Sequence, residues 1–129
     1  MLMPVEVAFK EPSLFMMRAY GVVTVDEVRL AVGEMLADTR LRDGVAIFID
    51  NREVTSVRSV GEVALITAEF GRVFARGLMR VAVLTDGELE ASQVFCAFAS
   101  TVGADAKVFR DEQKAREWLN GFAAKPLAS

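Results

Sequence analysis

The sequence contains no histidine, and Cys96 is the single cysteine among its 129 residues. Without imidazole, a serine or cysteine nucleophile has no histidine base, and metal sites built on histidine are excluded. One thiol permits no intramolecular disulfide and supplies too few ligands for a thiolate zinc site. We therefore expect no metal, no cofactor and no enzymatic activity, and the cysteine content fits a reducing cytoplasm.

The chain also lacks a net positive charge and long apolar runs. The formal net charge of −3 opposes binding to the phosphate backbone of nucleic acids. No apolar run approaches the roughly 20 residues that a membrane-spanning helix needs. The first residues, MLMPVEVAFKEP, lack the basic segment and cleavage pattern of a secretory signal. These absences predict a cytoplasmic protein that neither binds nucleic acid nor inserts into a membrane.

Apolar residues, in contrast, are plentiful at 53%, and the chain length is typical of one domain. Stretches 5–9 and 14–21 flank a turn and predict an N-terminal β-hairpin. Continuous β-branched runs at 43–50 and 78–85 are typical of strands buried on both faces. A further short strand is predicted at 106–109.

Helical periodicity alternates with these strands, and capping boxes mark two of the helix starts: Thr24 with Glu27, and Ser59 with Glu62. A third helix is predicted to end at Gly103 and a fourth to begin after Asp111. The resulting order ββαβαβαβα predicts a single α/β domain over residues 1–122. It would have a mostly parallel central sheet with flanking helices. A flexible tail is predicted over residues 123–129.

Candidate site residues follow the strand at 43–50, because ligands and partners of parallel sheets usually meet the carboxyl ends of the strands. Asp50 ends this predicted strand, and Arg52, Arg58, Ser59 and Gly61 follow in a loop that leads to the second helix. One interpretation of Ser59 is a helix cap. Unmodified, the helix N-terminus and the two arginines form a candidate anion or partner site. Phosphorylation of Ser59 would place negative charge beside the same arginines.

Two other polar or reactive residues receive structural interpretations. Asp50 resembles the phosphoacceptor of a receiver domain, but the acidic pair and the lysine of such a site do not occur at the corresponding strand ends. We therefore interpret Asp50 as a turn former or as a partner of Arg52. Cys96 lies among apolar residues in the middle of a predicted helix and is interpreted as a small core residue.

The predicted element order and four stretches of sequence carry a family resemblance: AYGVVTVDEV, FIDNREV, MRVAVLTD and VFRDEQKAREWL. In these features the chain resembles the bacterial SpoIIAA-like proteins, also described as STAS or SEC14-like. The resemblance implies a non-enzymatic interaction domain, in a group that includes regulators switched by serine phosphorylation. The segment RSVG aligns Ser59 with the phosphorylated serine and Gly61 with a glycine of the motif. Arg58 stands where that group has aspartate, which changes what a partner kinase would read.

Two functional hypotheses follow. The first is a protein-interaction or regulatory domain that acts through the loop from Asp50 to Gly61. The second, from the SEC14-like side of the resemblance, is a domain that binds an apolar or anionic small molecule between sheet and helices. Leu65, Ile66, Val73 and Val94 are additional apolar residues on the helices. They predict either a homodimer interface or a sheet curved enough to cover them.

Overall fold

The computed structural model describes residues 4–10, 12–56, 58–87 and 89–123, with the side chains of 89, 122 and 123 excluded. The strands are β1 Val5–Lys10, β2 Leu14–Gly21, β3 Ala46–Val54, β4 Arg80–Leu84 and β5 Asp105–Phe109. The helices are α1 Val25–Ala37, α2 Val60–Phe74, α3 Leu89–Thr101 and α4 Glu112–Ala123. This order confirms the predicted ββαβαβαβα pattern.

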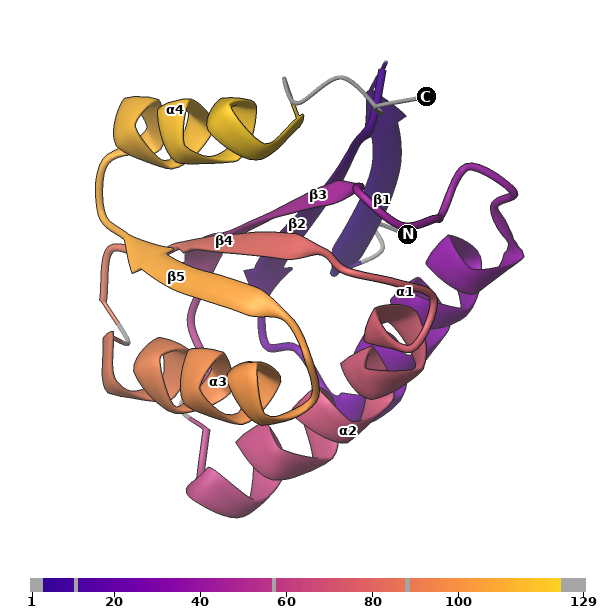
Figure 1. Ribbon diagram of the computed structural model, residues 1–129. Coiled ribbons are helices and arrows are strands. Elements are labelled where there is room, and N and C mark those ends of the chain that lie inside the picture. The colour runs from indigo at the N-terminus through magenta and orange to yellow at the C-terminus, as the bar shows by residue number, and fades with distance from the viewer. Residues whose placement is uncertain (1–3, 11, 57, 88, 124–129) are drawn as a thin grey trace.

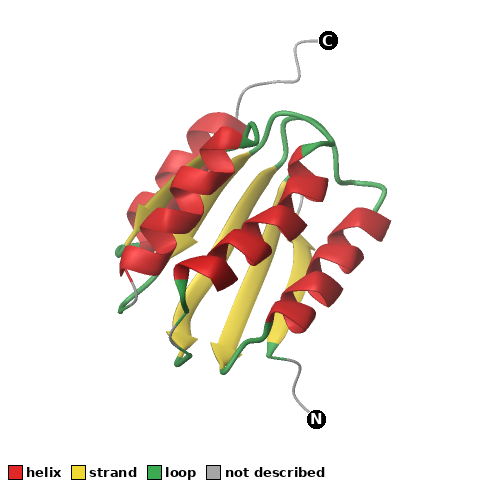
Figure 2. Ribbon diagram, turned by 90° about the horizontal axis from the view of Figure 1, so that it is seen from below, coloured by secondary structure: helices red, strands yellow, loops and turns green. Residues whose placement is uncertain are grey.

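The five strands form one sheet in the order β1-β2-β3-β4-β5. β1 and β2 are the predicted antiparallel hairpin, with Val5 opposite Ala19. From β2 to β5 every neighbouring pair is parallel. The arrowheads of the central strands consequently point toward the same edge of the sheet (Figure 2). We call this side, where β2 to β5 end, the carboxyl edge.

Helices cover both faces of the sheet: α1, α2 and α3 lie on one face and α4 lies on the other (Figure 1). Side chains that alternate along each strand feed two separate cores. Ile47, Ile49, Val81 and Val83 join the large core beneath α1–α3. Phe48 and Leu84 join a smaller core with Ala115 and Leu119 of α4. Trp118 packs against this smaller core.

The two predicted capping boxes are confirmed. The Thr24 hydroxyl accepts a hydrogen bond from the Glu27 amide at 3.2 Å, and the Glu27 carboxylate accepts one from the Thr24 amide at 2.8 Å. Ser59 and Glu62 make the equivalent pair of bonds at the start of α2, at 3.1 and 3.2 Å. Each box satisfies two amides that have no partner within the helix.

The predicted end of the third strand was wrong. β3 does not end at Asp50 but continues to Val54, because Glu53 and Val54 pair with Tyr20 and Gly21 of β2. Asp50 and Arg52 are therefore strand residues, and the connection to α2 spans only residues 55–59. α4 includes Ala123, and the remainder of the predicted tail, 124–129, lies outside the described residues.

Candidate binding cavity

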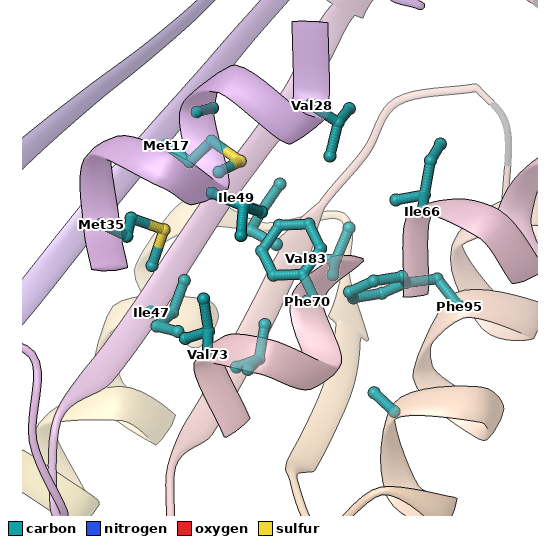
Figure 3. Packing of buried hydrophobic residues seen from close by; sticks show 14 of the residues in the cluster. Met17, Val28, Met35, Ile47, Ile49, Ile66, Phe70, Val73, Val83 and Phe95 are labelled. Atoms are coloured by element: carbon teal, nitrogen blue, oxygen red, sulfur yellow. The ribbon is translucent and has the colours of Figure 1, made fainter. Parts of the chain in front are cut away.

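A cavity of about 300 Å³ lies between the sheet and helices α1, α2 and α3, at the carboxyl edge. Strands β2, β3 and β4 form its floor with apolar side chains that face these helices. The helices add apolar side chains from above, and Figure 3 shows how several of them converge. The apolar lining includes Met17, Ala19, Ile49, Val83, Val28, Ile66, Phe70 and Phe95.

Two phenylalanines form an aromatic wall of the cavity. Phe70 of α2 and Phe95 of α3 meet edge to face, with ring centroids 5.4 Å apart (Figure 3). Both are buried, with 2% and 7% of their surface exposed. Because α2 and α3 project them toward each other, they set the distance between these helices beside the cavity. This wall offers an apolar surface of fixed shape to an occupant.

Two buried residues that carry hydroxyl groups interrupt this apolar lining. Thr85 follows β4 on the same face as Val81 and Val83, and Ser92 lies on α3 one turn before Phe95. Their exposed fractions are 2% and 6%, and both residues line the cavity. Within the described part of the chain, neither hydroxyl makes a hydrogen bond and neither oxygen is fully buried. Each is therefore available to a hydrogen-bonding group inside the cavity.

Further polar residues surround the mouth. Asn51 lies on β3 two residues after Ile49, so both side chains share the face toward the helices. The Ser56 hydroxyl accepts a hydrogen bond from the Val23 amide at 3.3 Å and joins the connection after β3 to the segment before α1. Half-buried Arg58 and exposed Asp86 complete the rim. Because α1, α2 and α3 each follow a parallel strand, all three begin at this edge.

Asp50 and Arg52, two of the predicted site residues, form an ion cluster with α4. The Arg52 guanidinium donates to both carboxylate oxygens of Asp50 at 3.1 and 2.9 Å, and to Glu112 at 2.9 Å. Burial opposes ionisation of Asp50, but the hydrogen bonds from Arg52 lower its pKa below the usual value. The interpretation of Asp50 as a partner of Arg52 is confirmed. Arg52 also borders the cavity, but two carboxylates hold its guanidinium.

The other three predicted residues lie at the start of α2. Ser59 is exposed and its hydroxyl caps the helix, which confirms the structural interpretation. Gly61 is exposed in the first turn of α2, and Arg58 lines the cavity mouth. Four of the five predicted residues thus contribute to an ion cluster, a cavity rim or a helix cap, and Gly61 contributes to none of them. Phosphorylation of Ser59 remains a prediction.

Metal-binding and thiol chemistry find little support in the described residues. These residues include no group of three or more aspartate, glutamate or cysteine side chains that could hold a metal ion. Burial raises the pKa of the Cys96 thiol to about 12, so it is not a reactive thiolate near neutral pH. None of the described helices is both long and apolar enough to cross a membrane.

Thr85 and Ser92 were missed as site residues, although the sequence holds a signal for each. Thr85 continues the period of two set by Val81 and Val83, which marks it as an inward polar residue at a strand end. Ser92 shares the helical spacing of Phe95 and Ala99, so it falls within an apolar stripe. A polar residue at an apolar position is the more informative observation.

Comparisons with known proteins agree with this architecture. A model of the family described as SpoIIAA-like matches residues 14–120. A similar solved structure is that of an uncharacterised protein of the DUF3478 family with a SpoIIAA-like fold, from Shewanella loihica PV-4. It has a TM-score of 0.59 and 21% sequence identity, over 89% of this chain and 91% of that chain. No curated protein matches the chain.

Proposed function

The chain belongs to the SpoIIAA-like family, and from this premise we propose that it binds a small, largely apolar organic molecule without transforming it. The observation that carries the proposal is the cavity of about 300 Å³ at the carboxyl edge. Its volume lies at the lower end of the range of roughly 300–1,000 Å³ for small-molecule sites. Its apolar lining with a few polar groups at one end also matches such sites.

The apolar lining of the cavity supports an occupant. The cavity opens at its mouth, so without a ligand it holds water against an apolar lining, and an apolar occupant would remove that lining from water at a gain of about 25 cal/mol per Å². With roughly 30 Å³ for each water-sized group, the cavity holds on the order of ten non-hydrogen atoms. At about 0.8 kcal/mol per atom, such a ligand would bind with a Kd near 1 µM.

Binding without catalysis is proposed because of how the polar groups are arranged. A hydroxyl nucleophile needs an adjacent base within hydrogen-bond distance. Among the described residues, no hydrogen bond joins Thr85 or Ser92 to such a base. A reducing cytoplasm is the compartment that we propose, since Cys96 is buried as a free thiol.

Two neighbouring residues of α2 provide a matched test. Ile66 is 7% exposed and lines the cavity, whereas Leu65 is 58% exposed. We expect Ile66→Phe to fill part of the cavity and to abolish binding, and Leu65→Phe to leave binding intact. Native mass spectrometry of gently purified protein and thermal shifts with C6–C10 alkyl compounds would measure both. The proposal fails if the wild type carries no molecule and responds to no compound, or if Ile66→Phe binds as the wild type does.

A protein-contact function is the second candidate, and the exposed apolar residues of α2 favour it. Val60 and Leu65 are 62% and 58% exposed, and Val60 directly follows the connection at 55–59. A second copy of the chain is the partner that we propose, because two-fold pairs are the commonest oligomers. Light scattering after size exclusion should detect a dimer that Val60→Ser/Leu65→Ser converts to monomer. Val102→Ser, at an exposed residue that directly follows α3, should leave the dimer intact. A monomer at every concentration would refute the dimer.

A further inference from the structure

Building on the proposed cavity function, we propose that the ligand is an anionic amphiphile: a carboxylate with a short alkyl body. Its head would lie at the end of the cavity lined by Thr85, Ser92 and Arg58. Its body would lie against Phe70 and Phe95. The proposal specifies both the chemical class of the ligand and its direction in the cavity.

The hydroxyls of two buried residues define where the head lies. Thr85 and Ser92 are more than nine-tenths buried, and both line the cavity. Neither hydroxyl bonds to another group in the described part of the chain. A hydroxyl that faces a cavity can donate one hydrogen bond to an occupant. The two oxygens of a carboxylate can accept a hydrogen bond from each.

Charge at the mouth determines the sign of the head. Helices α1, α2 and α3 all begin at the carboxyl edge, and the N-terminal end of a helix favours an anion. Each helix already carries a glutamate in its first turn, Glu27, Glu62 and Glu90, but none of these three lines the cavity. Arg58 adds a guanidinium at the rim. Arg52 is neutralised by Asp50 and Glu112. Asp86 is an opposing charge, but it is exposed and screened by water. The balance favours a single negative charge over a cation, and the carboxylate of Asp86 disfavours a polyanion.

The rest of the lining determines the body of the ligand. Much of the lining consists of aliphatic side chains and the two phenylalanines (Figure 3). Each methylene buried there should raise the affinity about fourfold. The gain should continue from butanoate until the cavity of about 300 Å³ is full, and then stop. A chain of about eight carbons matches the capacity of on the order of ten non-hydrogen atoms.

Three probes with the same alkyl chain separate this inference from the proposed function: octanoate, 1-octanol and octylammonium. Isothermal titration of the full chain should show octanoate binding at least tenfold more tightly than octylammonium. Thr85→Val keeps the side-chain shape and removes the hydroxyl. We expect this substitution to lower the affinity for octanoate about tenfold and to leave the affinity for octanol unchanged. Thr55→Val, a control at an exposed threonine, should change neither the affinity for octanoate nor the affinity for octanol.

The outcomes discriminate clearly. If octanol or octylammonium binds as tightly as octanoate, or if Thr85→Val leaves octanoate unchanged, the carboxylate inference is overturned and cavity binding stands. If none of the three probes binds and no other alkyl compound does, the proposed function fails as well. The Arg58→Gln variant provides a second test of the carboxylate inference, independent of the Thr85 variant. It should reduce the preference for octanoate over octanol while octanol binding persists.

Discussion

Gly77 should tolerate alanine poorly, since it follows α2 with a φ of +146°, a conformation that residues with a side chain rarely adopt. A Cβ atom there would lie 2.7 Å from the Cα atom of Asp43. The backbone at Asp43 would have to move. The Asp43 carboxylate also accepts a hydrogen bond from the amide of Leu78 at 2.6 Å, and this movement would disturb it. The conformation costs about 1–3 kcal/mol for a non-glycine residue, and a lost hydrogen bond costs about 1 kcal/mol. We expect Gly77→Ala to lower the free energy of unfolding by about 3 kcal/mol.

Gly71 supplies the matched control in the same segment. It lies within α2, and a Cβ atom added there would meet no atom within 4 Å. Alanine is favoured over glycine inside a helix by roughly 0.5–1 kcal/mol. The same chemical change should therefore stabilise the protein at Gly71 and destabilise it at Gly77. At about 2.1 cal/mol/K per residue, Tm should rise by roughly 3 °C for Gly71→Ala and fall by roughly 11 °C for Gly77→Ala.

Urea unfolding, followed by circular dichroism and by the fluorescence of Trp118, would measure both variants. The m value should stay constant, because neither change alters the surface exposed on unfolding. A Gly77→Ala protein within about 1 kcal/mol of the wild type would refute the steric and conformational reasoning. A Gly71→Ala protein as unstable as Gly77→Ala would show that crowding is not confined to the contact with Asp43.

Two further predictions concern hydrogen bonds to side-chain oxygens. Ser59→Ala and Thr24→Ala each remove one capping box, so each should cost about 1 kcal/mol in urea unfolding; unequal losses would argue for an additional role of one residue. Hydrogen bonds from Arg40 lower the pKa of Asp38 from 3.8 to about 2. Its stabilising contribution should therefore be complete above pH 3.8 and disappear as the pH falls through 2. Asp38→Asn should remove this pH dependence of the free energy of unfolding. An Asp38 carboxyl that titrates near pH 3.8 by NMR would contradict the stabilising role of the Arg40 hydrogen bonds.

Local patterns were sufficient to predict most of the fold. Thr24 and Ser59 with their glutamates predicted the first residues of two helices, because a capping box involves only four consecutive residues. The strand that contains Ile47 and Ile49 was recognised from its continuous apolar run. Its extension to Val54 was missed, since NREV is polar and is held in β3 by pairing with β2. Such tertiary pairing overrides local propensity.

The cavity was beyond the reach of sequence patterns. Its existence depends on the spacing between three helices and the sheet, which Phe70 and Phe95 set through a contact across two elements. The candidate loop was correctly placed at the carboxyl edge. The prediction that Arg52 and Arg58 serve one anion site was not met, because Arg52 pairs with Asp50 and Glu112. Arg52 points to α4 because side chains of a strand alternate between faces, and the extension of β3 that fixes this alternation was not predicted.

The strand order also has a consequence for how the chain acquires its structure. Each of the five described strands pairs only with strands adjacent to it in the chain, so the spatial order of the sheet follows the order of synthesis. A ribosome that releases the chain from its N-terminus would expose a complete docking edge for each new strand as it emerges. No early strand must wait for a distant partner, which limits the time that unpaired edges are open to aggregation. The cavity would then close late, when α3 docks beside α2.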